Sequence, residues 1–335
     1  MAVTGLTRNQ FIGFCRYEGS NPSVSAFAGI GFPMPVIILT LHFSKRELPK
    51  SISSEETYQR STLIKEHTTM LANFHTHTTL CDGNNTPEEM ILAALEKGFT
   101  ALGFSGHGYT HFDFDFCMMD TDSYIAEIKR LKEKYKNDIR IYLGVEEDCH
   151  QWVDRSAFEY MIGSCHYIYK DGVHYSLDAY KGCQDKCLEA FGGDTMAMAH
   201  AYYSTFCDYI RQRKPDIIGH FDIITKYEEV TPSRFFSNPQ YHKMAEEFLM
   251  DAIKSGCVFE VNMGAMSRGY RTSCYPAVNL LHILKKENAR IILSSDCHNT
   301  QALDAYFAET KEILRDVGFT HTYTLTDNGF VPVAL

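Results

Sequence analysis

The stretch Asn73-Phe74-His75-Thr76-His77-Thr78-Thr79-Leu80-Cys81-Asp82-Gly83 decides the fold that this sequence predicts. Its apolar lead-in, residues 71–74, predicts a buried strand that runs directly into His75 and His77. Side chains two positions apart in an extended chain project from the same face. The two imidazoles therefore lie together at the end of the strand, where they can bind one metal ion. Asp82 follows in a turn closed by Gly83 and can add an oxygen ligand.

The alternative is a pair of surface histidines beside a polar loop, because two histidines at this spacing are a weak signal on their own. The metal site is favoured because residues that can bind metal recur at the ends of further predicted strands. Further strands are predicted over residues 101–105, 139–145, 160–164, 216–219, 258–261 and 291–295. All but the sixth strand of the set of seven end in a good metal ligand, and the sixth ends in Asn262. The ligands after these later strands are His107, Glu146, His166, His220, Asp296 and His298.

Helical patterns alternate with the strands. They cover residues 86–97, 122–135, 178–191, 194–213, 239–254, 275–287 and 302–317. The first begins with an N-cap threonine, a proline at the first helical position and two glutamates, as helix starts commonly do. This alternation predicts an α/β fold with a parallel sheet and helices outside. Seven strands favour a distorted (β/α)7 TIM-like barrel, in which functional groups gather at the carboxyl ends of the strands.

Composition restricts the possible partners. The chain has 335 residues, 44% of them hydrophobic, and a formal net charge of −10, which argues against general binding to nucleic acid or to an anionic membrane. A local cluster of metal ions could still attract a small anionic substrate. The 11 cysteines lack the spacing of a disulfide scaffold, so we expect reduced thiols and a cytoplasmic location. The sequence leaves open whether the chain forms a homo-oligomer.

Residues 1–69 differ from the remainder, which we expect to form one domain over residues 70–335. Their most apolar part, 36–41, is too short for a membrane span of about 20 residues. A signal peptide is the alternative, but a small-residue cleavage site does not follow cleanly. We expect a poorly ordered N-terminal extension that contributes nothing to the fold.

Deleting residues 1–69 should therefore leave activity and melting temperature unchanged. Activity assays and thermal unfolding of the shortened chain test this expectation, and loss of soluble protein would contradict it.

The candidate ligands are six imidazoles and three carboxylates, namely His75, His77, Asp82, His107, Glu146, His166, His220, Asp296 and His298. A catalytic zinc takes about three protein ligands, so this set suffices for three ions that share a bridging carboxylate. Mixed nitrogen and oxygen ligands favour Zn, Mn or Fe over Mg or Ca alone. Paired divalent ions activate water and stabilise attacking and leaving oxygens, which fits phosphate-ester hydrolysis. Amide or nucleobase hydrolysis at the same metals remains open.

Six motifs resemble, in order, those of the polymerase-and-histidinol-phosphatase (PHP) phosphoesterases. The resemblance covers about residues 70–335, and segments 159–168 and 216–227 are most similar to histidinol-phosphatases of this family. It implies hydrolysis of the small substrate histidinol phosphate in histidine biosynthesis. The motifs are His75-Thr76-His77, Ser105-Gly106-His107, Gly144-Val145-Glu146, Ile162-Gly163-Ser164-Cys165-His166, Ile218-Gly219-His220-Phe221-Asp222 and Ser294-Ser295-Asp296-Cys297-His298.

The resemblance also implies roles for the ligands. Glu146 bridges a first and a second ion, and Asp296 or His298 assists with protons during catalysis. Asp82 stands where some family members have histidine, which puts the binding of the third ion in doubt. The implied sets are His75, His77, Glu146 and Asp296 for the first ion, Glu146, His166 and His220 for the second, and Asp82, His107 and His298 for the third.

Phosphate also needs cationic donors. Arg268, in the loop above the sixth strand, can hold two phosphate oxygens, and Lys226 is a second candidate. Either could instead be a solvated surface charge. We expect Asp222 to orient a ligand imidazole. Trp152 either lines the pocket or caps the barrel.

Two other functions remain open. One keeps the metals and changes the substrate to a phosphotyrosine, a nucleotide or a sugar phosphate. The other is a metal-binding accessory domain without activity. The remaining histidines are expected to be surface or packed residues, with His174 and His200 the least certain. A nucleic-acid enzyme is disfavoured because the chain lacks a basic stripe interleaved with aromatic residues.

Overall fold

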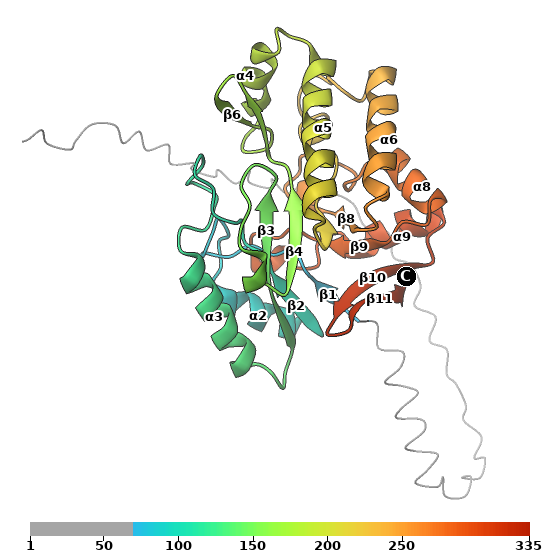
Figure 1. The fold of residues 1–335 in the computed structure, drawn as a ribbon. Helices are drawn as coiled ribbons and strands as arrows, with labels where there is room; N and C mark the ends of the chain where they lie inside the picture. Colours follow the sequence, from blue (N-terminus) through green and yellow to red (C-terminus); the bar gives the residue numbers. More distant parts are fainter. Residues whose placement is uncertain (1–69) are drawn as a thin grey trace, which may run out of the picture. The chain divides into compact units, whose positions relative to one another are not determined.

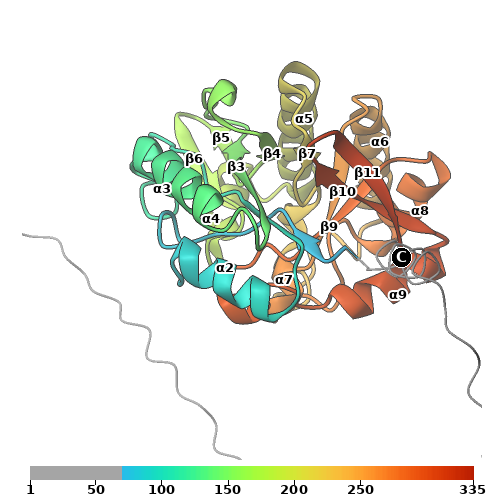
Figure 2. The ribbon, with the colours of Figure 1, turned by 90° about the horizontal axis from the view of Figure 1, so that it is seen from below.

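The computed structural model describes residues 70–335, so the expectation for residues 1–69 lies outside the described part of the chain. A nine-stranded sheet runs through these residues in the order β1-β2-β3-β4-β7-β8-β9-β10-β11 (Figures 1 and 2). Neighbours from β1 to β10 pair in parallel, and β10 and β11 form an antiparallel hairpin. The strands are β1 (Ala72–Asn73), β2 (Ala101–Phe104), β3 (Arg140–Asp148), β4 (Tyr160–Ser164), β7 (Ile217–Ile218), β8 (Val258–Asn262), β9 (Ile291–Ser294), β10 (His321–Thr326) and β11 (Gly329–Ala334).

Helices connect the parallel strands, which confirms the predicted mixed α/β class. The α-helices are α2 (Pro87–Glu96), α3 (Thr121–Lys134), α4 (Cys183–Ala190), α5 (Thr195–Arg213), α6 (Pro239–Ile253), α7 (Gly264–Ser267), α8 (Val278–Lys286) and α9 (Phe307–Val317). Short 3-10 turns are η1 (Arg155–Ala157), η2 (Ile223–Thr225) and η3 (Thr300–Ala302). Helix α2 begins as predicted, with a capping box in which Thr86 and Glu89 satisfy each other's backbone N–H groups. Among the described residues, no helix is both long and apolar enough to cross a membrane.

Two features of the fold were missed by the sequence analysis. A separate hairpin, β5 (Tyr167–Lys170) and β6 (Val173–Ser176), precedes α4, and the helix predicted from residue 178 begins only at Cys183. The turn of this hairpin is Asp171-Gly172, and both residues have positive φ (51° and 84°). Asp-Gly between alternating residues is a strong hairpin signal, so the sequence did contain it. The second missed feature is the hairpin of β10 and β11.

The segments that follow β1 and β9 are joined by backbone pairing. Thr76 forms a parallel bridge with Cys297, and the N–H of His77 donates to the carbonyl of Cys297 at 2.9 Å. A second bridge joins His107 to Glu146 just past β2. The backbone pairing therefore continues into the segments that carry the candidate ligands and holds them at the same edge of the sheet.

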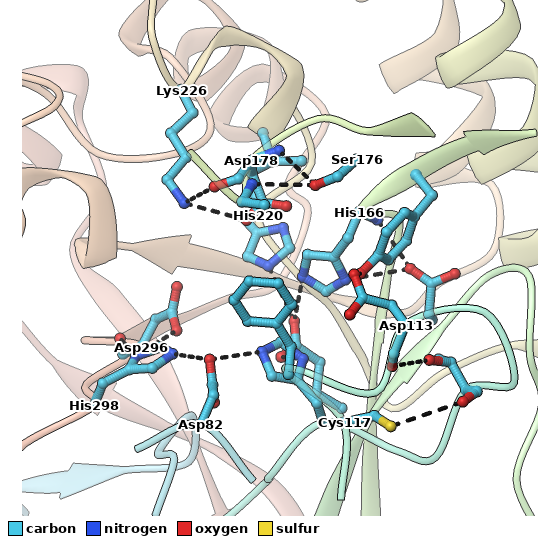
Figure 3. A pocket seen from close by; sticks show the side chains of 18 of the residues that line it. Asp82, Asp113, Cys117, His166, Ser176, Asp178, His220, Lys226, Asp296 and His298 are labelled. Atoms are coloured by element: carbon cyan, nitrogen blue, oxygen red, sulfur yellow. Dashed lines mark hydrogen bonds and ion pairs between the residues drawn. The ribbon is translucent and has the colours of Figure 1, made fainter. Parts of the chain in front are cut away.

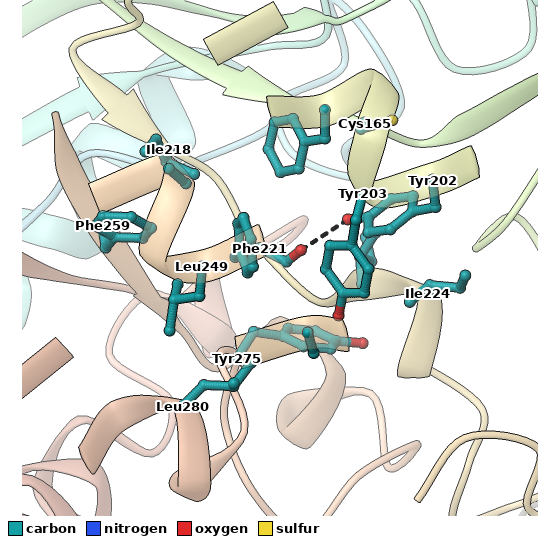
Figure 4. Packing of buried hydrophobic residues seen from close by; sticks show 14 of the residues in the cluster. Cys165, Tyr202, Tyr203, Ile218, Phe221, Ile224, Leu249, Phe259, Tyr275 and Leu280 are labelled. Atoms are coloured by element: carbon teal, nitrogen blue, oxygen red, sulfur yellow. Dashed lines mark hydrogen bonds between the residues drawn. The ribbon is translucent and has the colours of Figure 1, made fainter. Parts of the chain in front are cut away.

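Tyr160 ties the core to the first of these segments. Its ring lies beneath two glycines, because an added Cβ at Gly103 or Gly144 would come within 2.4 Å of it. The Tyr160 hydroxyl donates to the carbonyl of Phe74 at 2.6 Å, one residue before His75. On the other face of the sheet, a larger cluster of buried aromatic and aliphatic side chains packs against α5, α6 and α8 (Figure 4). The sheet edge that carries the ligands is thus packed on both faces.

Candidate metal centre

The nine predicted ligands converge at one edge of the sheet, although they are spread over more than two hundred residues of sequence. Each side chain lies at or just beyond the carboxyl end of a parallel strand, except that of Asp82, which lies in the loop after β1. His75, His77, Glu146 and His220 are almost completely buried. The chain therefore withdraws imidazoles and carboxylates from water together, which is costly unless they are paired or bind cations.

Glu146 lies at the centre of the cluster. One carboxylate oxygen, Oε1, lies 3.2 Å from His166 Nε2 and 3.0 Å from His220 Nε2. The other oxygen, Oε2, lies 3.1 Å from His75 Nε2, 3.0 Å from His107 Nδ1 and 3.5 Å from His77 Nε2. A single carboxylate thus faces imidazoles from several strand ends, as a bridging ligand would.

Asp82 and Asp296 extend the cluster on either side of His77. Asp82 Oδ2 lies 3.0 Å from His298 Nε2 and 3.6 Å from His107 Nε2. Asp296 Oδ1 lies 3.3 Å from His77 Nε2. Asp296 also has φ of 50°, an unfavourable conformation for a residue other than glycine that is often found at functional sites.

Several of these atoms are buried yet make no hydrogen bond within residues 70–335. They are His75 Nε2, His77 Nε2, Asp82 Oδ1 and Glu146 Oε2. Buried polar atoms are nearly always satisfied, so a group of unsatisfied ones needs an explanation. Nitrogen and oxygen lone pairs directed at a common space are the arrangement that divalent cations complete. The donor set therefore fits metal ions.

The electrostatics of the cluster also favour cations. Burial lowers the pKa of His75, but nearby carboxylates, first that of Glu260, outweigh it and raise this pKa to about 10. Burial raises the pKa of Glu146, but neighbouring imidazoles, first that of His75, bring it well below its usual value. The carboxylates therefore remain anionic and attract positive charge, which protons on the imidazoles supply here and which bound cations can supply in their place.

Two carboxylates behind the ligands were missed by the sequence analysis. His75 Nδ1 lies 2.5 Å from Glu260 Oε1, and the amide of Asn262 donates to Glu260 Oε2 at 2.9 Å. His166 Nδ1 lies 3.2 Å from Asp148 Oδ2. Such contacts fix which nitrogen of an imidazole is free to bind metal. Alternation along β8 places Glu260 on the same face as Asn262, and this signal could have identified it.

Replacing Glu260 by glutamine should weaken metal binding about 10- to 100-fold, because His75 loses the charged carboxylate acceptor that orients it. Titration against a competing chelator measures this affinity. The control is Glu246→Gln, at an exposed position of α6, and equal affinities for the two variants would contradict the assigned role.

The expectation for Asp222 was wrong, and of the two alternatives for Trp152 the structure does not support lining of the pocket. Asp222 accepts the N–H of Ala277 at 3.0 Å and lies near Arg271, so it does not orient His220. Trp152 is 47% exposed and stacks against the guanidinium of Arg213, outside the cavity. Both side chains belong to surrounding structure, and their proximity in sequence to ligands gave a misleading signal.

A cavity of about 200 Å³ opens above the cluster (Figure 3). Both predicted cationic residues line it, with Arg268 near Asp296 and Lys226 near Asp178. Asp113 also faces this space. Asp178 and Asp113 were not predicted, because nothing in their local sequence distinguishes them from other loop aspartates.

The ends of the parallel strands in this α/β sheet bring imidazoles and carboxylates together beneath a cavity. The fold and the site therefore define a protein with a candidate metal centre. The chain belongs to the PHP domain family, whose family model matches residues 73–264, more than half of the sequence. Three of the predicted site residues lie beyond the matched segment, namely Arg268, Asp296 and His298.

The curated relatives that match this chain are named as histidinol-phosphatases. A probable histidinol-phosphatase of Schizosaccharomyces pombe is 23% identical over 254 residues, covering 70% of this chain and 81% of the relative. One of Deinococcus radiodurans is 25% identical over 264 residues, covering 75% of this chain and 95% of the relative. The histidinol-phosphatase of Bacillus subtilis is 23% identical over 259 residues, covering 70% of this chain and 95% of the relative.

Solved structures show the same fold. A putative histidinol phosphatase of Listeria monocytogenes aligns with a TM-score of 0.60 at 18% identity, covering 71% of this chain and 99% of that one. The histidinol phosphate phosphatase of Lactococcus lactis aligns with a TM-score of 0.56 at 16% identity, covering 78% of this chain and 99% of that one. The latter structure contains zinc, L-histidinol and phosphate.

Proposed function

We propose that this chain is a histidinol-phosphatase, which hydrolyses L-histidinol phosphate to L-histidinol and phosphate in the cytoplasm, as a step of histidine biosynthesis. The observation that carries the proposal is the convergence of nine candidate metal ligands, with Glu146 at their centre, beneath a cavity with charges of both signs. Membership of the PHP domain family and the names of the curated relatives support it.

Three divalent ions, Zn, Mn or Fe, are proposed to occupy the cluster. The distances support the sets expected from the sequence, with Glu146 shared between the first two ions and Asp82 serving the third. Bound divalent ions would activate water and neutralise charge on phosphate oxygens. The same bridge between Thr76 and Cys297 supports a sheet closed into a distorted barrel of seven parallel strands, with the ions at one rim.

The protein's own groups would bind the phosphate and accept a proton. Arg268 Nη2 lies 3.1 Å from Asp296 Oδ2, and Nη1 lies 3.2 Å from His298 Nδ1, so its guanidinium is held at the cluster beside the cavity. Burial, and then the charge of His77, lower the pKa of His298 to about 4, and nearby cationic groups hold the pKa of Asp296 well below its usual value. Both groups are therefore unprotonated at neutral pH, the form that binds a metal ion. The pKa of His298 lies nearer to neutrality than that of Asp296, so His298 is the better acceptor for the proton lost by an attacking water.

The same cavity suits the cationic part of the proposed substrate. Histidinol carries an amine and an imidazole, and the cavity places Asp113 and Asp178 among its lining groups, in addition to the cluster. Asp178 is already paired with Lys226 at 3.2 Å, whereas Asp113 accepts a hydrogen bond only from neutral groups, the Tyr167 hydroxyl at 2.6 Å and the Asp115 N–H at 3.1 Å. Asp113 therefore has the more available negative charge for an ammonium or imidazolium group.

Phosphate release from L-histidinol phosphate, compared with release from p-nitrophenyl phosphate and a panel of sugar phosphates and nucleotides, tests the proposal. Protein supplied with Mn²⁺ or Zn²⁺ should prefer histidinol phosphate. Equal rates on the panel would favour a PHP phosphoesterase with another substrate. Fewer than two ions per chain by elemental analysis would instead favour an accessory domain.

Replacing Asp113 by asparagine should raise KM for histidinol phosphate about tenfold, because one charge-assisted contact is lost. KM for p-nitrophenyl phosphate, which has no cationic group, should stay unchanged. Asp115→Asn is the control, since Asp115 is exposed and does not line the cavity. A parallel change for both substrates would show that Asp113 acts on the fold of the loop rather than on the substrate.

A further inference from the structure

Two buried thiols lie directly behind the candidate metal centre. Cys149 follows β3 and Cys165 follows β4, and their sulfur atoms are 3.0 Å apart. All ten cysteines of the described residues are free thiols, so this pair is reduced here. Both side chains belong to the large core cluster that packs against α5, where Cys165 lies near Tyr202 and Tyr203 (Figure 4). The site has no role in the proposed phosphatase reaction.

The backbone places the two cysteines opposite each other. Strands β3 and β4 pair in parallel up to Asp148 and Ser164, and the N–H of Cys149 then donates to the carbonyl of Ser164 at 2.8 Å. Neighbouring strands lie about 4.8 Å apart, which is within the Cα separation of about 4.4–6.8 Å that a disulfide requires. A bond between the sulfur atoms therefore needs a local adjustment and no rearrangement of the fold.

We propose that Cys149 and Cys165 are a reversible oxidation site, at which a hydroperoxide converts the two thiols to a disulfide. Cys149, 9% exposed against 0% for Cys165, is the more accessible thiol, and we take it as the one that is oxidised first. Its sulfur attacks the peroxide oxygen, giving a sulfenic acid and releasing an alcohol or water that takes the thiol proton. The Cys165 sulfur then displaces the sulfenic oxygen, which leaves as water, and a dithiol reductant restores both thiols.

Oxidation at this site would disturb the metal centre, if the proposed function is correct. Cys165 immediately precedes His166, and Cys149 immediately follows Asp148, the carboxylate that accepts the His166 N–H at 3.0 Å. Disulfide formation draws the sulfur atoms from 3.0 Å to about 2.05 Å. Metal–ligand distances tolerate deviations of only about 0.2 Å, so a shift of the adjoining backbone should weaken binding at His166.

The test uses the full chain, purified with a reductant, supplied with Zn²⁺ and then treated with hydrogen peroxide. Peptide mapping without reduction should show a cross-link between the peptides that contain Cys149 and Cys165. Phosphatase activity should fall about tenfold or more, with loss of bound zinc after gel filtration, and dithiothreitol followed by fresh zinc should restore both. Cys149→Ala should prevent the cross-link and protect activity, whereas Cys207→Ala, a buried thiol of the same cluster, should behave as the unsubstituted chain.

Each part of the proposal can be overturned separately. Absence of the cross-linked peptide under excess peroxide would overturn the oxidation site, and this measurement on the unsubstituted chain needs neither a variant nor an active enzyme. A cross-link that leaves zinc content and activity unchanged would overturn the coupling to the metal centre. Peroxide inactivation that persists in Cys149→Ala would do the same. If the reduced chain fails to hydrolyse histidinol phosphate, the proposed function fails, and peptide mapping and zinc content still decide the thiol chemistry.

Discussion

Replacing Glu146 by alanine should lower kcat for phosphate release by at least about a thousandfold, a loss of about 4 kcal/mol of transition-state stabilisation. The reason is that both oxygens of this carboxylate face imidazoles of the cluster, so that Glu146 contacts proposed ligands of both the first and the second ion. Removal also leaves buried imidazoles without their central counter-charge. Phosphate release with Zn²⁺ or Mn²⁺, together with bound metal per chain, measures the effect.

His77→Ala should show the same loss, since His77 contacts Asp82 and Asp296 as well as Glu146. His282→Ala is the control, because His282 is exposed on α8 and should leave activity within a few-fold. A Glu146→Ala protein with full metal content and near-normal kcat would show that the cluster is not the reaction centre.

Arg268→Ala should lower kcat/KM for histidinol phosphate roughly 100- to 1000-fold, because a guanidinium can make two charge-assisted hydrogen bonds to phosphate, each worth about 1.5–3 kcal/mol. Arg268 lines the cavity and is held at the cluster by the backbone carbonyl and the carboxylate of Asp296. Steady-state kinetics on histidinol phosphate, with inorganic phosphate as a competitive inhibitor, measure the loss.

The conservative variant separates phosphate binding from support of the cluster. Arg268→Lys keeps the charge but loses the planar pair of donors, so it should recover only part of kcat/KM and of phosphate affinity. Bound metal should stay at the level of the unsubstituted chain in both variants. Loss of metal in Arg268→Ala would mean that the residue maintains Asp296 rather than binding phosphate.

The sequence predicted the parallel α/β organisation and the convergence of the ligands because both follow from short-range rules. Apolar runs that end in His or Asp mark strand ends, and parallel pairing brings those ends to one edge. The prediction of where α2 begins also rested on a local signal, since Thr86 and Glu89 form a capping box within four residues. These predictions needed no knowledge of which strands are neighbours.

The missed features depend on contacts between distant segments. Glu260 lies inside β8 rather than at its end, and its role appears only when His75 is placed beside it, 185 positions away in sequence. Asp222 looked like a partner of His220, but its carboxylate is used by the N–H of Ala277 from another segment. Local spacing identifies which side chains can reach a site, whereas their hydrogen-bond partners are set by tertiary packing.

The bridge between Thr76 and Cys297 joins the first part of the centre to the last. During synthesis, His75 and His77 leave the ribosome long before Asp296 and His298, so a nascent chain exposes only part of the donor set. Loading with ions is then a late event that follows translation of nearly the whole polypeptide.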